Sequence, residues 1–475
     1  MSQTIEELRE RYGPRYRWRV LFSLMIGSMA AILASTIVNV AVPDLSAHFG
    51  LGQERAQWVS TAFMLAMTLS MLATPWLLLR FGLRDTYAGA VLLLLVGGVV
   101  GGFSINYPML ISMRVMEGLA AGILQPIPAI YILRVFDRSE HGRAMGIFGF
   151  GVVLAPAIGP SVGGFLVEEF GWRSIFFVVV PFCLLALFLV RKLLPKISTM
   201  AGDAQTLDWR GLLLASIGVV MLLNGMVSLQ KDTWTGVALL LAGLMTLALF
   251  IWHQMRTPHP LVAMRVFRYR QFSTATCVAF IYGIALFGST YMLPVYTQMA
   301  LNYSPSHAGL VILPAGIVLA LVMPLAGKMV DYYAPYLLVA LGIALIGLSF
   351  VLMSTGKPGT GYVALMVWAI IGRIGLGFVL PALSVGSMRG VDPTLIAHGT
   401  STINFVRQLG GAIGVSMVGI VLEWRLAAHH TALGDAGGNP ADRIKAFDET
   451  FLLLAAICAI AVLLAWRMRP APEPE

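Results

Sequence analysis

Long, uncharged apolar segments recur along the whole of this 475-residue chain and constrain its fold more than any other feature. A helix that crosses a bilayer needs about 20 mostly apolar residues, because its backbone polar groups must be paired within the segment. We predict fourteen such segments joined by short loops, and therefore an all-helical integral membrane protein without a soluble domain. Their approximate ranges are 18–43, 56–79, 86–104, 107–133, 143–167, 174–194, 210–229, 234–255, 272–299, 306–329, 335–354, 361–388, 399–424 and 449–466.

Composition excludes several other classes of protein. Only 12% of the residues are charged and 58% are hydrophobic, whereas soluble domains carry about 25% charged residues. The three cysteines, Cys183, Cys277 and Cys458, lie in apolar segments and have no metal-ligand spacing, so neither a metal site nor a disulfide framework is expected. The chain contains no phosphate-binding Gly-x-x-x-x-Gly-Lys-Ser/Thr loop, so no ATP site or other cofactor is expected.

The net charge of +9 is a signal of topology and not of nucleic-acid binding. Cytoplasmic loops of membrane proteins carry an excess of Lys and Arg. Most of the 32 basic residues, including the arginines before residue 20, fall in segments that an inside N-terminus places in the cytoplasm. We therefore expect both termini to be cytoplasmic, and no nucleic acid to be a partner.

An internal repeat links features that lie eight predicted helices apart. Arg114 in the fourth segment corresponds to Arg373 in the twelfth, and small residues follow each of them. Two six-helix halves separated by two inserted helices produce this offset, and parallel repeats are the plan of one large transporter class. The expected divisions are a tail at 1–17, a bundle at 18–194, two extra helices at 195–271, a second bundle at 272–466 and a tail at 467–475.

A glycine- and proline-spaced pattern occupies the fifth predicted segment. Small residues let two membrane helices approach closely, and proline bends the helix that carries it. We expect this helix to lie at the contact between the two halves of the molecule. The residues of the pattern are Gly151, Pro156, Gly159, Pro160, Gly163 and Gly164.

Several motifs together resemble one family of transporters. They lie at 33–43, 110–118, 151–164, 172–177, 291–298 and 404–411. The chain resembles the major facilitator superfamily, and within it the fourteen-helix drug:proton antiporter branch of the EmrB/QacA type. The resemblance implies alternating access in a bacterial inner membrane, and gate residues in the loops after the second and tenth helices. Those residues are Arg80, Gly82, Arg84, Gly327 and Asp331.

The resemblance also implies partners, and the chain departs from the family at two positions. Relatives in double-membrane bacteria often join a periplasmic adaptor and an outer-membrane channel, for which the predicted outer loop at about 425–448 is the expected docking surface. The family usually has Asp where this chain has Ala34 and Leu79. The corresponding acid of the second half, Asp331, is retained.

Glu117 is the one acidic residue, of 23, that lies well inside a predicted span. An ionised side chain at the bilayer centre costs about 3 kcal/mol on insertion scales, so it persists only with a partner or with access to water. Arg114 precedes it by three residues, which places both side chains on one face of a helix. Two interpretations follow: Glu117 is the proton-responsive acid with Arg114 controlling its protonation, or the two form a static ion pair.

Other polar residues inside the predicted spans are candidates for a substrate path. The alternatives are ordinary packing for tyrosines, helix–helix hydrogen bonds for asparagines and snorkelling for Arg407, which is expected near the cytoplasmic end of its helix. The candidates are Asn39, Gln125, Tyr291, Gln298, Arg373, Asn404 and Arg407.

These features favour a proton-coupled exporter of drugs or other amphipathic small molecules. A single buried carboxylate favours cationic substrates, whereas Arg114, Arg373 and Arg407 favour anionic or zwitterionic substrates. The alternative is a dedicated exporter of one metabolite, lipid or siderophore, with altered or absent proton coupling. An enzyme is not expected, because no nucleophile–base pair or metal cluster is predicted at a common depth.

Overall fold

The structure is a computed structural model that describes residues 13, 15–194, 206–229, 232–301, 303, 305–357, 359–431 and 440–469. Throughout this part the regular structure is helical. The first helices are α2 (Tyr16–Phe49), α3 (Gln53–Ser70), α4 (Thr74–Gly102), α5 (Tyr107–Leu124), α6 (Ile127–Val135), α7 (His141–Phe170), α8 (Ser174–Phe177) and α9 (Val179–Leu193). Two central helices follow, α10 (Trp209–Ser228) and α11 (Thr233–Arg256). The last are α12 (Arg270–Val295), α13 (Pro305–Tyr332), α14 (Pro335–Met353), α15 (Tyr362–Ser387), α16 (Ile396–Ala428) and α17 (Pro440–Trp466).

The helices account for fourteen membrane-length segments in the described residues. Twelve helical stretches are long and apolar enough to span a bilayer. One of them, Arg55–Gly102, is 48 residues long and divides at Gly82, whose φ of 75° and ψ of 174° interrupt the helix. Only glycine adopts such a conformation readily. The 30-residue helix α7 completes the set, and the predicted fold class is confirmed.

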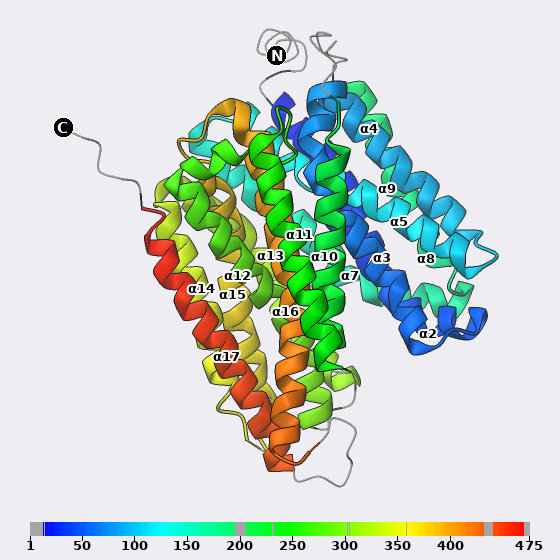
Figure 1. The fold of residues 1–475 in the computed structure, drawn as a ribbon, viewed down its shortest axis with the longest axis vertical. Coiled ribbons are helices and arrows are strands. Elements are labelled where there is room, and N and C mark those ends of the chain that lie inside the picture. Colours follow the sequence, from blue (N-terminus) through cyan, green and yellow to red (C-terminus); the bar gives the residue numbers. More distant parts are fainter. Residues whose placement is uncertain are drawn as a thin grey trace.

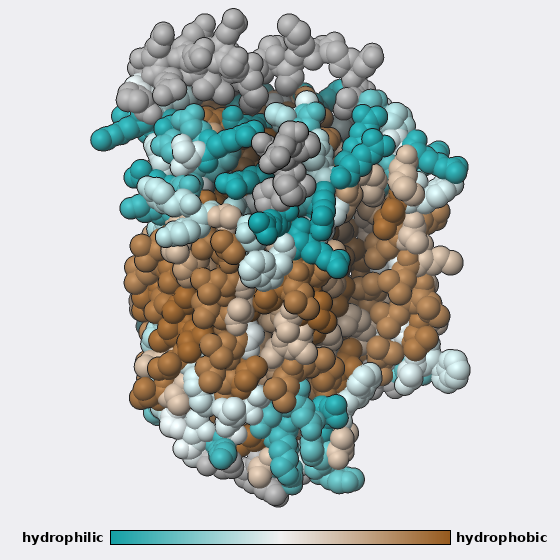
Figure 2. Space-filling view, turned by 90° about the vertical axis from the view of Figure 1, so that its left-hand side faces the viewer, coloured by the Kyte–Doolittle hydropathy of each residue, from teal (hydrophilic) through white to brown (hydrophobic). Residues whose placement is uncertain are grey.

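The helices form two bundles with a pair of helices between them. In Figure 1, α2–α9 make one bundle and α12–α17 make the other. Helix α10 contacts α3 of the first bundle and α16 of the second, and α11 packs along α10. Helix α2 begins and α17 ends at the same end of the molecule, which we call the terminal face; the other end is the opposite face. Figure 2 shows an apolar belt across the middle of the face in view, with hydrophilic residues at both ends. Such a surface fits a lipid bilayer.

A small hydrogen-bond network fastens the central helices at one end. Asp208 precedes α10, and its carboxylate accepts hydrogen bonds from the Gly211 N–H at 2.9 Å, from His253 at 2.8 Å and from Gln254 at 2.7 Å. Burial raises the pKa of Asp208, but these hydrogen bonds outweigh it and hold the pKa below its usual value. The next loop reaches the second bundle, where His398 of α16 lies 3.1 Å from the Leu261 carbonyl oxygen.

The loop between the last two helices is shorter than its sequence predicts. The expected loop at 425–448 contracts to 429–439, because α16 continues to Ala428 and α17 already begins at Pro440. Glu449 pairs with Arg425 at 3.2 Å and with His429 at 3.3 Å, which stabilises both helices beyond their apolar stretches. A span predicted from hydropathy ends where charged residues begin, so the prediction does not include these extensions of α16 and α17. Residues 432–439 lie outside the described part of the chain.

Glycines allow α3 and α5 to pack backbone against backbone. A methyl group added at Gly118 would lie 2.3 Å from the Phe63 carbonyl oxygen, and one at Gly122 would lie 2.0 Å from the Met67 carbonyl oxygen. Helices α14 and α15 repeat this arrangement, since a methyl group at Gly375 would lie 2.4 Å from the Gly342 carbonyl oxygen. Close backbone approach at small residues is how helices gain contact inside a bilayer.

Gly118→Ala is therefore expected to destabilise the protein by about 1–3 kcal/mol, the usual cost of overpacking. The matched control is Gly89→Ala in α4, where an added methyl group meets nothing within 4 Å. Thermal unfolding of the detergent-purified protein measures both. The midpoint should fall for Gly118→Ala and stay unchanged or rise slightly for Gly89→Ala. Equal midpoints for the two variants would contradict the packing described here.

Candidate functional site

A buried ion pair lies inside the first bundle, on α5. Arg114 and Glu117 are each only 1% exposed, and Arg114 Nη1 donates to Glu117 Oε2 at 2.5 Å. The i,i+3 spacing predicts this contact, because residues three apart on a helix are neighbours. Two charges removed from water persist only with good geometry and further hydrogen bonds.

Those further hydrogen bonds come from the backbones of two neighbouring helices. Arg114 Nε donates to the Val59 carbonyl at 3.1 Å, and Nη1 donates to the Ala34 carbonyl at 3.2 Å. The guanidinium also lies 4.3 Å from the centroid of the Phe63 ring, a favourable cation–π distance. The hydrogen bond to position 34 therefore goes to the backbone carbonyl, since Ala34 carries no carboxylate.

Glu117 faces the interior of its own bundle. A methyl group added at Gly97 would lie 2.7 Å from Glu117 Cγ, and one at Gly98 would lie 3.6 Å from Glu117 Oε1. Both glycines belong to α4, and the absence of their side chains makes the room that this carboxylate occupies. In the described structure, neither member of the ion pair lines the central pocket.

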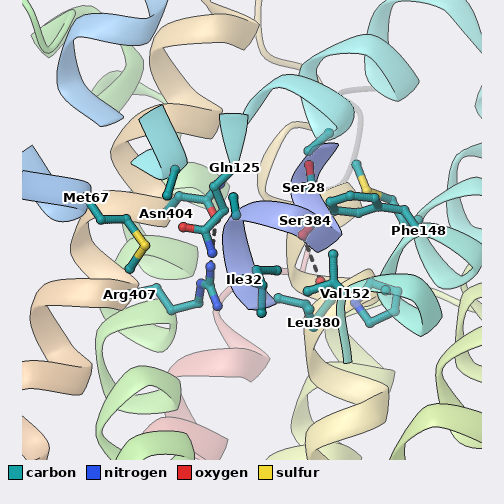
Figure 3. A pocket seen from close by; sticks show the side chains of 16 residues that line it. Ser28, Ile32, Met67, Gln125, Phe148, Val152, Leu380, Ser384, Asn404 and Arg407 are labelled. Carbon is teal, nitrogen blue, oxygen red and sulfur yellow. Dashed lines mark hydrogen bonds between the residues drawn. The ribbon is translucent and has the colours of Figure 1, made fainter. Parts of the chain in front are cut away.

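The central pocket lies between the two bundles and takes its lining from both. The space in it that the centres of water-sized molecules can occupy is about 60 Å³. The lining comes from α2, α3, α5, α6 and α7 of the first bundle and from α15 and α16 of the second (Figure 3). Most of its lining is apolar. The polar members are Ser28, Gln125, Ser384, Asn404 and Arg407.

Arg407, Asn404 and Gln125 gather on one side of this pocket (Figure 3). Arg407 is 8% exposed, and its Nη2 donates to Asn404 Oδ1 at 2.9 Å. Asn404 in turn donates through its amide nitrogen to the Thr400 carbonyl at 2.9 Å, which fixes the orientation of the amide. Arg407 thus lies within the bundle interface, and not near the end of its helix as the sequence led us to expect.

The other four substrate-path candidates lie elsewhere. Arg373 lines a separate pocket within the second bundle. Asn39 is exposed and accepts a hydrogen bond from Ser60 at 2.7 Å. Tyr291 is 37% exposed, and Gln298 lies half-buried in a π-helical turn at Tyr296–Ala300. The sequence also missed the pocket residues Ser28 and Ser384, because nothing in a hydrophobic segment marks which face meets a cavity.

The bundles touch most closely where α7 crosses α13. A methyl group at Gly142 would lie 2.2 Å from the Gly327 carbonyl oxygen, so the two backbones are in contact. Asp331 of α13 accepts hydrogen bonds from the backbone N–H groups of Gly142 at 2.7 Å and Arg143 at 2.9 Å. The first N–H groups of a helix have no partner within it. A carboxylate of the second bundle therefore caps a helix of the first.

Helix α7 lies at the contact between the two bundles, as expected, but the glycines of its pattern pack against a helix of their own bundle. A methyl group added at Gly151 would meet Met25, one at Gly159 would meet Thr36, and one at Gly163 would meet Ile37. These three neighbours lie on α2 of the same bundle. A methyl group at Gly164 would meet only Val40, also on α2, at 3.9 Å. The contact with the other bundle is made earlier on α7, at Gly142, Gly146 and Gly149. Spacing predicts close approach but not the partner, and α7 crosses two helices at different heights. Pro156 is half-buried, and the side chain of Pro160 lies outside the described set.

The position of the first bundle that corresponds to Asp331 carries no acid. Leu79 stands where an acid is expected and is 54% exposed, Arg80 is exposed and Arg84 is half-buried. The segment that leads into α16 is capped locally instead, since Asp392 accepts a hydrogen bond from the Thr394 N–H at 2.8 Å. The two halves of the repeat are therefore joined asymmetrically.

Comparison with known proteins identifies similar chains over most of this length. The family model described as Major Facilitator Superfamily matches residues 24–415. A multidrug resistance protein B homolog of Mycobacterium tuberculosis is 32% identical over 84% of this chain and 75% of its own. A lincomycin resistance protein of Listeria innocua is 26% identical over 84% of this chain and 85% of its own. In fold, the human organic anion transporter MFSD10 superposes with a TM-score of 0.68 at 14% identity, over 94% of this chain and 99% of that one.

Removing the carboxylate in Asp331→Ala is expected to loosen the contact between the bundles. Loss of a helix cap costs about 1 kcal/mol, which changes a population ratio roughly fivefold. Spin labels at Ser139 and Tyr333, both exposed on the terminal face, report the separation of the bundles by double electron–electron resonance. The longer distances should gain population in Asp331→Ala.

The control for this measurement is Asp392→Ala, which removes a cap that does not cross between the bundles. Its distance distribution should match that of the unmodified protein. A shift of the same size in both variants would show that Asp331 does not hold the bundles together.

Proposed function

The chain belongs to the major facilitator superfamily, whose members are membrane transporters, and on that basis we propose that it exports amphipathic small molecules, drugs among them, in exchange for protons. The observation that carries this proposal is the central pocket, which takes its lining from both bundles. A site at the interface of two repeats is where transporters of this plan bind their substrates. The relatives named for resistance to drugs support export as the direction.

Alternating access follows from where the bundles touch. The Lys and Arg bias of the loops supports a cytoplasmic terminal face. The contact of α7 with α13, capped by Asp331, then closes the pocket on its cytoplasmic side. Rocking of one bundle against the other breaks this contact and opens the pocket inward, so that a substrate enters from the cytoplasm or the inner leaflet.

Glu117 is the proposed proton site. It occupies the same helix as Ala121, which lines the pocket one turn further along, and Gln125 caps the end of that helix in the same lining. Protonation removes the charge that pairs with Arg114, and a buried cation without its partner is strongly destabilised. Protonation of the carboxyl group therefore favours a shift of helix α5, and the part of the pocket that α5 lines moves with it.

Two further points concern the range of substrates and the partner proteins. A dedicated exporter of one metabolite, lipid or siderophore keeps this fold but accepts a narrow range of compounds. A periplasmic adaptor and an outer-membrane channel are not needed for the mechanism. Their expected docking loop is reduced to 429–439, most of which lies outside the described residues.

Glu117→Gln is expected to abolish substrate-driven proton movement, because the amide cannot release a proton. The measurement is proton flux in vesicles containing the purified protein, with an imposed pH gradient and a panel of cationic, neutral and anionic compounds. Glu168→Gln, which changes an exposed acid of α7, is the matched control and should behave as the unmodified protein. Proton release that persists in Glu117→Gln would exclude Glu117 as the coupling acid.

A double variant, Arg114→Gln with Glu117→Gln, separates coupling from a purely structural role. If the ion pair only holds α5 in place, removal of both charges leaves no unpaired ion and should restore proton-coupled transport. If Glu117 carries the proton, the double variant should remain uncoupled.

A further inference from the structure

Arg407 is the one ionisable side chain in the lining of the central pocket, as far as the structure describes it. A smaller adjoining pocket shares Arg407, Asn404 and Ser384 with it and likewise has no acidic residue in its lining. The charge that a bound molecule meets in both spaces is therefore positive.

The positive charge of Arg407 is not neutralised by a protein carboxylate. No Asp or Glu of the described residues lies within ion-pair distance, and the hydrogen bond found for the side chain is the one to Asn404. A guanidinium offers five N–H donors, so most of them remain free for another acceptor. Glu117 does not supply the missing charge, because it pairs with Arg114 outside the pocket.

An uncompensated cation that is more than nine-tenths buried is costly. A bound anion would offset that cost, and the guanidinium plane matches the two oxygens of a carboxylate or the oxygens of a sulfonate. Asn404 has its own amide fixed by the Thr400 carbonyl, and it holds one edge of the guanidinium in place. The remaining donors are left for a ligand.

Gln125 supplies a second polar group on the same side of the pocket (Figure 3). Its Oε1 is buried and has no hydrogen-bond partner among the described residues. A buried polar atom without a partner costs free energy, and a bound molecule with its own donor would remove that cost. Arg407 and Gln125 thus offer one strong donor group and one unsatisfied acceptor from opposite bundles.

The rest of the pocket suits an apolar body. Ile32, Met67, Phe148, Val152 and Leu380 line it from α2, α3, α7 and α15. Methionine and aromatic side chains adapt to different apolar shapes. A ligand that satisfies the whole lining has a broad apolar part and one anionic group.

We propose that the central pocket binds amphipathic organic anions, with the anionic group held by Arg407 and the apolar body held by the surrounding side chains. The proposal rests on the proposed export function, because it names the substrate class of the same pocket. Cationic compounds are disfavoured there by the unpaired guanidinium, and neutral ones gain only the apolar contacts.

Three probes that share one apolar body test the proposal. They are 1-pyrenebutyrate, its amide and 1-pyrenebutylamine, which carry charges of −1, 0 and +1 and whose fluorescence reports binding to the detergent-purified full chain. The unmodified protein should bind the carboxylate at least tenfold more tightly than the amide or the amine. Equal affinities, preference for the amine, or no binding of the carboxylate would overturn the proposal.

Variants of Arg407 test whether its charge causes the preference for the carboxylate probe. Arg407→Gln should lose the tenfold preference while its affinity for the amide changes less than twofold, and Arg407→Lys should keep part of the preference. The matched control is Arg389→Gln, which removes the charge of an exposed arginine outside the pocket. Gln125→Glu introduces an acid on the same side of the pocket and should shift the preference toward the amine. If Arg407→Gln kept the preference for the carboxylate, Arg407 would not be the anion-binding group.

Transport of the same probes in vesicles separates this proposal from the proposed function. If the amine is exported with proton movement and the carboxylate is not, the exporter stands and the anion site fails. If the carboxylate binds through Arg407 but none of the probes is transported, the anion site stands and export of this substrate class fails.

Discussion

Close approach of helix backbones is the constraint on which the rest of this structure depends. Two apolar helices in a bilayer gain little by burying side chains against each other, because lipid is equally apolar. Contact must then come from dispersion and short backbone distances, which require small residues. Gly118 provides this between α3 and α5, Gly375 between α14 and α15, and Gly142 with Gly327 between the two bundles. The same device that holds each bundle together also closes the interface between them.

Two sites at which this apolar molecule buries charge differ in how that charge is balanced. Arg114 and Glu117 neutralise each other inside one bundle, and two backbone carbonyls accept further hydrogen bonds from the guanidinium. Arg407 faces the central pocket and has an asparagine as its neighbour in place of an acid. The carboxyl group of Glu117 can gain or lose a proton, whereas the unpaired charge of Arg407 attracts a ligand of opposite sign. Proton coupling and substrate binding thus fall, on our proposals, to different residues on different helices.

The two halves of the repeat have diverged at their junction. Asp331 of the second half caps α7 of the first across the interface, while Leu79 of the first half offers no such cap in return. The segment before α16 relies on its own Asp392. Asp331 therefore accepts two hydrogen bonds across the interface, whereas Leu79 at the corresponding position has no carboxylate to accept them. The free-energy difference between the closed and the open conformation depends on Asp331 more than it would if both positions carried an acid.

The sequence by itself determined the features that depend on local physics. Hydropathy over about 20 residues specifies the fourteen spans, the repeat specifies two halves with inserted helices, and helical periodicity brings Arg114 next to Glu117. Tertiary structure alone decided which distant polar residues share a pocket, so that Arg407 and Gln125 meet there while Asn39 and Arg373 do not. It also decided that the glycine pattern of α7 packs on α2, and that ion pairs extend α16 and α17 into the predicted loop. A membrane helix is apolar on every side, so its sequence does not reveal which face meets lipid, a neighbouring helix or a cavity; only the packing of all the helices together assigns those faces.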